Sequence, residues 1–257
     1  MNEAAFAVGS PRLIISELDY HPFPPTAAEQ AAGHRDADDF EFIEFFNPGD
    51  ATFDLSGVRF VDGVEFHFDA SSVRSLPPGG YVLVVRNLAA FRARHGTGAL
   101  VAGEYSGGLS NSGERIAVAD AAGSVIVEFT YAPRSPWPTA PFGGGSTLEL
   151  IGSDLNPALP QSWRASATRG GTPGNAPDAG PLLIHSARLA GDELRIVFSA
   201  APHTSYSVLG RDDLGAGSWQ PLQTLTATPA GGETEVRITI PPGNSRRFFQ
   251  IARNPAP

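Results

Sequence analysis

The sequence predicts an all-β protein built from two β-sandwich domains, with one short helix in the first. Apolar segments of strand length are separated throughout by Gly, Pro, Asn and Asp, the residues that form turns. The contents of glycine (29) and proline (23) are high for a helical protein and ordinary for a turn-rich β protein. From residue 181 onward the pattern restarts as six short segments at regular spacing, which is typical of a second, smaller sandwich.

The first domain is predicted to begin with a strand at residues 13–20. A long acidic loop with several prolines follows at 21–39, and loops of this length without their own pattern are usually functional or disordered. The next strand spans 40–46 and ends at the turn Asn47-Pro48-Gly49-Asp50. Further strands are predicted at 58–61, 64–68, 81–85, 115–119, 124–131 and 147–151.

One helix is predicted, at residues 88–95. Asn87 is suited to cap its first backbone N–H groups. Gly96 is placed to end it in the left-handed conformation.

The predicted organisation is a leader at residues 1–12, a first domain at 13–175, a linker at 176–180 and a second domain at 181–257. The linker follows a stretch rich in Pro, Gly, Ser and Thr. Strands of the second domain are predicted at 182–189, 193–199, 204–210, 219–227, 233–240 and 246–252.

Composition excludes several classes of chemistry. The 257 residues carry a net charge of −9, all 18 basic residues are arginine, and cysteine is absent. Without lysine there is no P-loop lysine and no Schiff base, and without cysteine there is no thiol catalysis. We therefore expect no nucleotide, pyridoxal phosphate or haem. An acidic chain is also unsuited to nucleic acid, and no apolar run reaches the ~18 residues of a membrane span.

The strand at 40–46 carries glutamates on both faces. Successive side chains of a strand point to opposite sides, so Glu44 shares a face with Phe42, and Glu41 shares the other with Ile43. Whichever side meets the core, a carboxylate lies among apolar neighbours. Such a group costs several kcal/mol unless it is hydrogen-bonded, paired, protonated or bound to a cation.

One hypothesis is therefore a divalent cation (Ca, Mg, Mn or Zn) held near the two strands and their loop, because carboxylate and imidazole ligands suit these ions. The predicted ligands are Glu17, Asp19, His21, Asp39 and Glu41. The competing interpretation, which we favour, is that these acids cap turns or pair with arginines such as Arg35, Arg59 and Arg115.

A second polar face alternates with Phe66 and Phe68 and carries Glu65, His67 and Asp69. We favour the interpretation that it is the hydrated side of an antiparallel strand. If that face met the other acids, His67 would become a ligand or a general base. The candidate catalytic residues are thus Glu17, Glu41 and His67.

Residues 13–175 resemble the bacterial lamin tail domain. The resemblance is carried by LIISELDYHP, DDFEFIEFFNPGDATFDLSGVRFVDGVEFHF, LPPGGYVLVVRNLAAFRARHG, YSGGLSNSGERIAVADAAGSVIVEFTY, and SPWPTA followed by GGGSTLELI. It implies an immunoglobulin-like β-sandwich. The segments FSAAPHTSYSVLGRDDLGAGSWQPL and RRFFQIAR resemble short fibronectin-like domains, which implies a second small fibronectin-like β-sandwich.

These resemblances imply an extracellular or cell-surface, non-catalytic binding or structural module of a larger exported bacterial protein. The partner would be a protein, a glycan or a small molecule. The cation hypothesis drawn from the acid and His residues would add stabilisation by a bound ion to this module. Residues 1–10 lack the features of a signal peptide, so we expect a mature or truncated segment. The alternative is a metal-dependent hydrolase acting on ester, phosphoester or glycosidic bonds through the acid and His cluster around Glu17 and Glu41. A third hypothesis makes the second domain a mere spacer.

Overall fold

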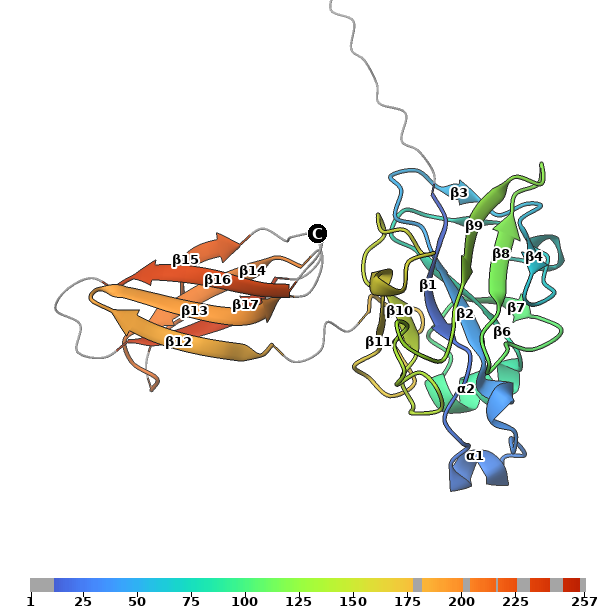
Figure 1. Ribbon diagram of the computed structural model, residues 1–257, viewed down its shortest axis with the longest axis horizontal. Coiled ribbons are helices and arrows are strands. Elements are labelled where there is room, and N and C mark those ends of the chain that lie inside the picture. Colours follow the sequence, from blue (N-terminus) through green and yellow to red (C-terminus); the bar gives the residue numbers. More distant parts are fainter. Residues whose placement is uncertain are drawn as a thin grey trace, which may run out of the picture. The chain divides into compact units, whose positions relative to one another are not determined.

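The computed structural model describes residues 12–177, 182–200, 204–215, 217–225, 232–240 and 247–254. The chain divides into two compact units, Met1–Asp178 and Ala179–Pro257. Both units consist mainly of β-strands (Figure 1), as the sequence predicts.

The first unit contains two main sheets. The larger has six strands in the order β11-β10-β1-β2-β6-β7, and the smaller has three in the order β4-β8-β9. The larger sheet is formed by β1 (Ile14–Asp19), β2 (Phe42–Phe46), β6 (Tyr81–Val85), β7 (Val101–Glu104), β10 (Leu148–Leu150) and β11 (Trp163–Ala165). The smaller is formed by β4 (Arg59–Asp62), β8 (Arg115–Ala119) and β9 (Val125–Thr130), and β3 (Phe53–Asp54) pairs with β5 (Ser75–Leu76).

The core of the first unit lies between these sheets. Ile43 and Phe45 of β2 are fully buried in one apolar cluster with Ile116 and Val118 of β8. The opposite face of β2 is also buried, because Phe42 belongs to a second cluster that includes Phe91 of the helix α2 (Leu88–His95). The larger sheet is therefore covered on both faces, which leaves no hydrated side for its glutamates.

The described residues form two α-helices, one more than predicted. α2 forms at residues 88–95 as predicted, and the Asn87 side chain accepts hydrogen bonds from the N–H groups of Ala89 and Ala90. Gly96 ends the helix with a positive φ of 78°, as predicted, but its ψ of −161° is extended instead of left-handed helical. The loop predicted to lack a pattern contains a short helix, α1 (Ala27–Ala31), and a 3₁₀ turn, η1 (Ala37–Phe40). Both helices lie at the end of the unit opposite β3 (Figure 1).

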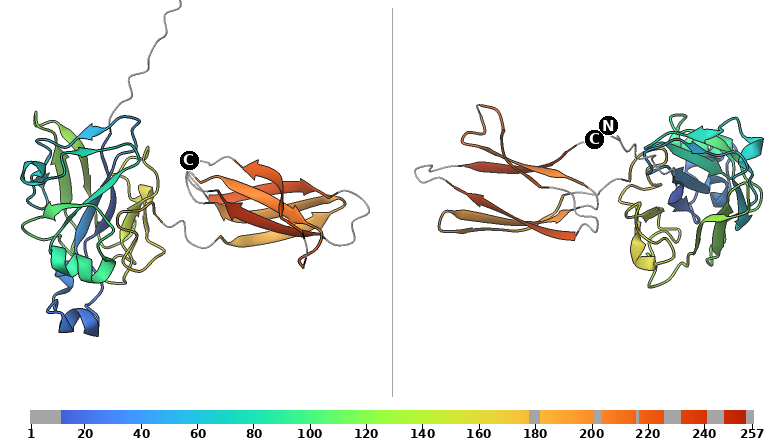
Figure 2. Two further views of the ribbon diagram at one scale, coloured as in Figure 1. Left: turned by 180° about the vertical axis from the view of Figure 1, so that it is seen from behind. Right: turned by 90° about the horizontal axis from the view of Figure 1, so that it is seen from above.

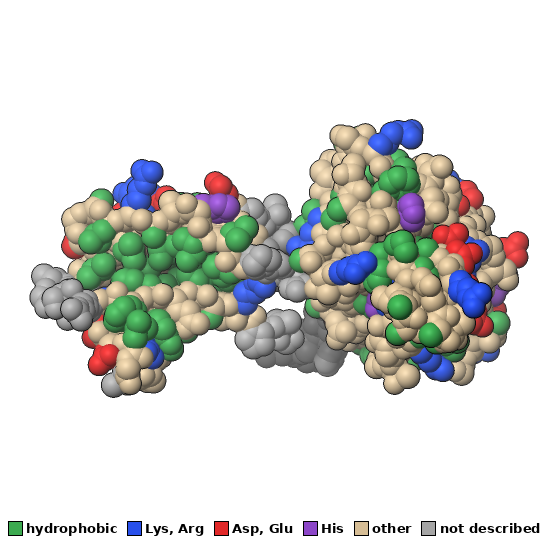
Figure 3. Space-filling view, turned by 90° about the horizontal axis from the view of Figure 1, so that it is seen from below, with side chains coloured by type: hydrophobic (Ala, Val, Ile, Leu, Met, Phe, Trp, Pro, Cys, Tyr) green, Lys and Arg blue, Asp and Glu red, His purple; other side chains and the backbone are tan. Residues whose placement is uncertain are grey.

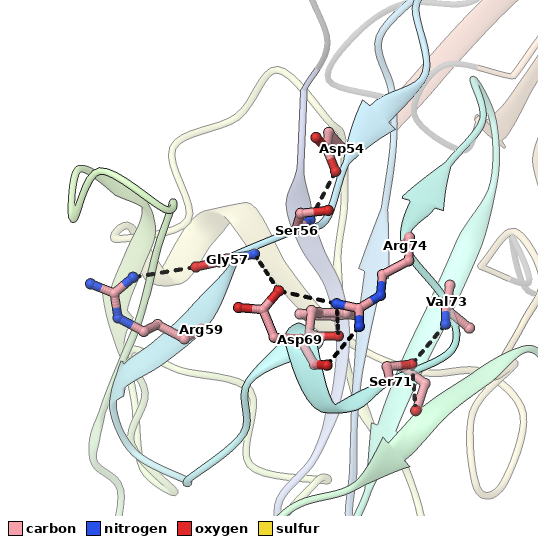
Figure 4. A network of polar contacts seen from close by, with 10 residues as sticks. Asp54, Ser56, Gly57, Arg59, Asp69, Ser71, Val73 and Arg74 are labelled. Carbon is pink, nitrogen blue, oxygen red and sulfur yellow. Dashed lines mark hydrogen bonds and ion pairs between the residues drawn. The ribbon is translucent and has the colours of Figure 1, made fainter.

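The strand predicted at 64–68 is wrong. This segment forms only isolated bridges, Arg59 with His67 and Glu65 with Ser106, and then enters the 3₁₀ turn η2 (Phe68–Ala70). Polar contacts hold the turn in place (Figure 4). The carboxylate of Asp69 accepts hydrogen bonds from Gly57 N and from Arg74, both at 3.0 Å.

The second unit consists of two three-stranded sheets, in the orders β12-β13-β16 and β15-β14-β17, which form two layers (Figure 2). Its strands are β12 (Ile184–Ala190), β13 (Glu193–Ala200), β14 (Tyr206–Arg211), β15 (Gln220–Leu225), β16 (Gly232–Thr239) and β17 (Phe248–Arg253). These six strands fit the expected small fibronectin-like sandwich. Residues 226, 227 and 246 of the predicted strands lie outside the described residues.

The core of the second unit is small. It is centred on Phe198, Tyr206 and Val208. Hydrophobic side chains also gather in a band on one face of this unit (Figure 3), and along the β12 edge Ile184 and Leu189 are more than half exposed.

Candidate functional site

The register of the larger sheet places three glutamates side by side. Glu17 of β1 lies opposite Glu149 of β10 on one side and opposite Glu44 of β2 on the other. All three residues are 0% exposed. We call these residues, Glu149, Glu17 and Glu44, the glutamate row.

The central carboxylate, Glu17, is held by donors from a distant part of the chain. The hydroxyl of Thr147 donates to its Oε1 at 2.5 Å, and the N–H of Thr172 lies 3.2 and 3.3 Å from its two oxygens. Burial raises the pKa of Glu17 well above its usual range, and the charges of Glu44 and Glu149 raise it further. Glu17 is thus a neutral acid at pH values where an exposed glutamate is ionised.

The two flanking carboxylates have donors of their own. Ser16 Oγ donates to Glu44 Oε1, and Gly174 N donates to Glu44 Oε2, both at 2.6 Å. Burial raises the pKa of Glu44 to about 7 despite these bonds. Glu149 forms an ion pair with Arg164 of β11 at 3.0 Å.

Residues 166–175, which we call the covering segment, lie against the glutamate row and contact Glu17 and Glu44. Gly171 of this segment has a φ of +74°, and a Cβ atom at its position would lie 1.6 Å from Glu17 Oε1. Only glycine combines that backbone conformation with so close an approach. The segment resembles a linker in sequence, but its backbone N–H groups solvate the buried acids.

Replacing Gly171 with alanine should therefore unfold or detach the covering segment. The new methyl group has no space beside Glu17, and we expect a loss of roughly 3 kcal/mol or more in unfolding free energy from overpacking and backbone strain. Gly79→Ala is the matched control, because Gly79 has a φ of +70° with nothing within 4 Å of its Cβ position. Equal losses in urea unfolding of the two variants would contradict the steric role of Gly171.

Glu41 is buried separately, on the opposite side of the sheet from the row. Its Oε2 accepts hydrogen bonds from the hydroxyl of Tyr105 and from Leu109 N, both at 2.9 Å, and its Oε1 lies 3.2 Å from the Arg86 guanidinium. Burial raises its pKa to about 7, although these three partners lower it. The carboxylates predicted on both faces of this strand segment therefore exist, and protein donors satisfy both.

The five predicted metal ligands do not form one group. Glu17 and Asp19 lie on β1, Glu41 precedes β2, Asp39 is in η1, and the His21 ring packs edge-on against Phe142. Within the described part of the chain, no three His, Asp or Glu side chains are arranged to hold a metal ion. Burial raises the pKa of Asp19 well above its usual range, while Arg94 lowers it.

The long loop is secured by a buried arginine that sequence reasoning did not identify. The side chain of Arg94 in α2 is 4% exposed and forms two hydrogen bonds with Glu29 of α1, at 2.9 and 3.1 Å. Its guanidinium lies between the rings of Phe23 and Phe40, 3.8 and 3.4 Å from their centroids. The hydrogen bonds from Arg94 lower the pKa of Glu29 to about 2.

His67, the third catalytic candidate, is exposed, whereas the other two candidates are buried. It lines an open groove of about 490 Å³ together with Glu65, Glu104 and the aromatic residues Phe60 and Phe66. Glu104 is already engaged, because its carboxylate accepts a hydrogen bond from Leu88 N at the start of α2. The structure thus brings His67 together with Glu65, but not with Glu17 or Glu41.

The fold and these contacts define an immunoglobulin-like β-sandwich in which buried carboxylates are tied to loops and to a covering segment. Residues 8–133 match the family model of the Lamin Tail Domain. The first unit therefore belongs to the lamin tail domain family, and an immunoglobulin-like domain of this kind fits a non-catalytic binding or structural module.

Other comparisons add little. Among curated proteins, none matches this chain. Among solved structures, the chain is similar to the secreted serine protease VesC from Vibrio cholerae, with 12% identity, 83% of this chain and 46% of that chain covered, and a TM-score of 0.17. This chain spans less than half of that chain's length, and so low a TM-score supports no conclusion. No helix of the described residues has the length and apolar character needed to cross a membrane.

Proposed function

We propose that this chain is a non-catalytic structural and binding module of a larger exported bacterial protein. One observation carries the proposal: the candidate catalytic acids Glu17 and Glu41, together with Glu44, are buried and hydrogen-bonded to protein donors. Glu17, Glu41 and Glu44 are each 0% exposed, and each accepts at least two hydrogen bonds.

A hydrolytic site would need different properties. A general base or a metal-activated water must reach the substrate within hydrogen-bonding distance. The donors of Glu17 and Glu44 belong to the covering segment and to neighbouring strands, so these acids stabilise loops instead of facing a ligand. We therefore assign them a structural role.

The export, the cell-surface location and the partner remain proposals based on the family. A module of this type would contact a protein, a glycan or a small molecule through its surface. A cation that stabilises the fold is a separate proposal, because Glu17, Glu41 and Glu44 already accept hydrogen bonds from protein groups.

A panel of generic esters, phosphoesters and glycosides tests the proposal. We expect no turnover above buffer with Ca, Mg, Mn or Zn, and no change in melting temperature with EDTA. Turnover that requires a metal and disappears in Glu41→Gln or His67→Ala would overturn it.

A second experiment tests the proposed location. An antibody against the chain should label intact cells of the source organism, and labelling only after permeabilisation would contradict export.

A further inference from the structure

We propose that Thr147 and Glu17 become joined by an ester bond, which cross-links the start of β10 to β1. The contact is built like an acyl-transfer site. The nucleophilic hydroxyl of Thr147 lies 2.5 Å from Glu17 Oε1, and both residues are 0% exposed. A hydroxyl in hydrogen-bonding contact with a carboxyl oxygen is also close to the carboxyl carbon, as a near-attack geometry requires.

The surroundings supply an oxyanion donor. The N–H of Thr172 lies 3.2 and 3.3 Å from the two oxygens of Glu17. A backbone N–H aimed at a carboxyl oxygen stabilises the negative charge that develops there during attack. Gly171 permits this approach, because any side chain at its position would displace the carboxyl group.

The electrophile is in its reactive form. An ionised carboxylate resists attack by a hydroxyl, whereas a neutral carboxylic acid can react. Burial, followed by the charges of Glu44 and Glu149, raises the pKa of Glu17 well above its usual range, which favours the neutral acid at pH values where an exposed glutamate is ionised.

The step balances without any co-reactant. The Oγ1 atom of Thr147 forms a bond to Cδ of Glu17, and the carbonyl electron pair moves onto the oxygen that faces Thr172 N–H. When this intermediate collapses, the bond from Cδ to the hydroxyl oxygen of Glu17 breaks. That oxygen leaves as water and takes the proton of the Thr147 hydroxyl.

Two features of the site favour ester formation. Fixed, well-oriented groups react with effective concentrations of about 10⁵ M or more, which far exceeds the concentration of competing water. The covering segment also excludes solvent, since Glu17, Thr147 and Gly171 are all buried. The backbone of Thr147 is itself fixed, because its N–H donates to Ser166 Oγ at 2.9 Å.

A neighbouring pair provides an internal control. Ser16 Oγ lies 2.6 Å from Glu44 Oε1, and this pair is also buried. The pKa of Glu44 is raised only to about 7, so this carboxyl is partly ionised at neutral pH and reacts less. At neutral pH the main cross-link should therefore map to Thr147, with at most a minor product at Ser16.

Intact mass spectrometry of the full chain, after incubation at mildly acidic to neutral pH, tests the inference. We expect a mass lower by one water molecule. Because trypsin cleaves here only after arginine, the cross-link should join peptide 13–35 to peptide 135–164. Hydroxylamine should cleave the linkage.

Matched variants complete the test. Thr147→Val should restore the full mass, whereas Ser16→Ala and Thr147→Ser should keep the deficit. A wild-type protein at full mass, with the two peptides separate, would overturn the proposal even if a variant fails to fold. So would a water loss that maps elsewhere, for example to a succinimide at Asp62-Gly63.

Discussion

Replacing Glu44 with glutamine should make the protein more stable at pH 8 and leave its stability nearly unchanged at pH 5. The folded-state pKa of this carboxyl is raised to about 7 from an ordinary value of 4.5, chiefly by burial. Ionisation at pH 8 therefore costs on the order of 3 kcal/mol, which the neutral amide avoids. Glutamine can accept from Gly174 N while its amide donates to Ser16 Oγ.

The direction of this pH effect follows from the linkage between proton binding and folding. A carboxyl with a raised folded pKa contributes stability that is complete below pH 4.5 and is lost as the pH rises through 7. Glu41 behaves in the same way, with a pKa of about 7. His95 opposes this trend below pH 6.5, because burial lowers its pKa to about 4, and its contribution is lost as the pH falls.

Urea unfolding of wild type and Glu44→Gln between pH 5 and pH 8 measures the effect. Glu65→Gln is the control, because this residue is exposed, and its pH profile should coincide with that of wild type. A Glu44→Gln variant that is less stable than wild type at pH 8 would contradict a raised pKa for Glu44.

Replacing Arg94 with alanine should destabilise the first unit by about 3–5 kcal/mol and release the long loop. The substitution leaves the buried carboxylate of Glu29 without its partner, and such broken pairs are costly. It also removes the cation that packs between Phe23 and Phe40. Two measurements apply: urea unfolding, and the rate of tryptic cleavage after Arg35, the exposed arginine of that loop.

Arg92→Ala is the matched control, since Arg92 lies on the same helix but is exposed. It should change stability by less than about 0.5 kcal/mol. The double variant Arg94→Leu, Glu29→Leu should recover much of the lost stability, because it removes both charges of the Arg94–Glu29 pair. If the double variant is as unstable as Arg94→Ala, the charge pair is not the main contributor.

Local patterns in the sequence predicted much of the fold. The strands β6 and β8 and the helix α2 form at the predicted residues, because their apolar runs and cap lie within a few residues of one another. The helix α1 was missed although Thr26 and Glu29 form a capping box, a signal that the sequence contains. The short strands β3 and β5 carry too few residues to show a period.

The site was predicted only in part. Alternation along one strand placed Glu41 and Glu44 on opposite faces and predicted one of them to be buried, whereas both are buried. The compensation could not be predicted, because it comes from groups far away along the chain, for example Tyr105 for Glu41 and Gly174 for Glu44. A backbone N–H group that donates to a distant side chain cannot be recognised in a sequence. The sequence therefore suggested a metal ion for Glu17, whose carboxylate in fact accepts from the N–H of Thr172 in the covering segment.

The covering segment has a mechanical consequence. Tension applied through residues 176 onward would first load the two amide contacts that Thr172 and Gly174 make with Glu17 and Glu44. Those contacts sit on adjacent strands in the interior, so peeling them would open the sheet to water at its most acidic point. The first unit should therefore unfold at lower force in alkaline solution when it is pulled from its C-terminal side. Glu44 is ionised at that pH, and hydration of its exposed carboxylate would lower the free energy of the opened state.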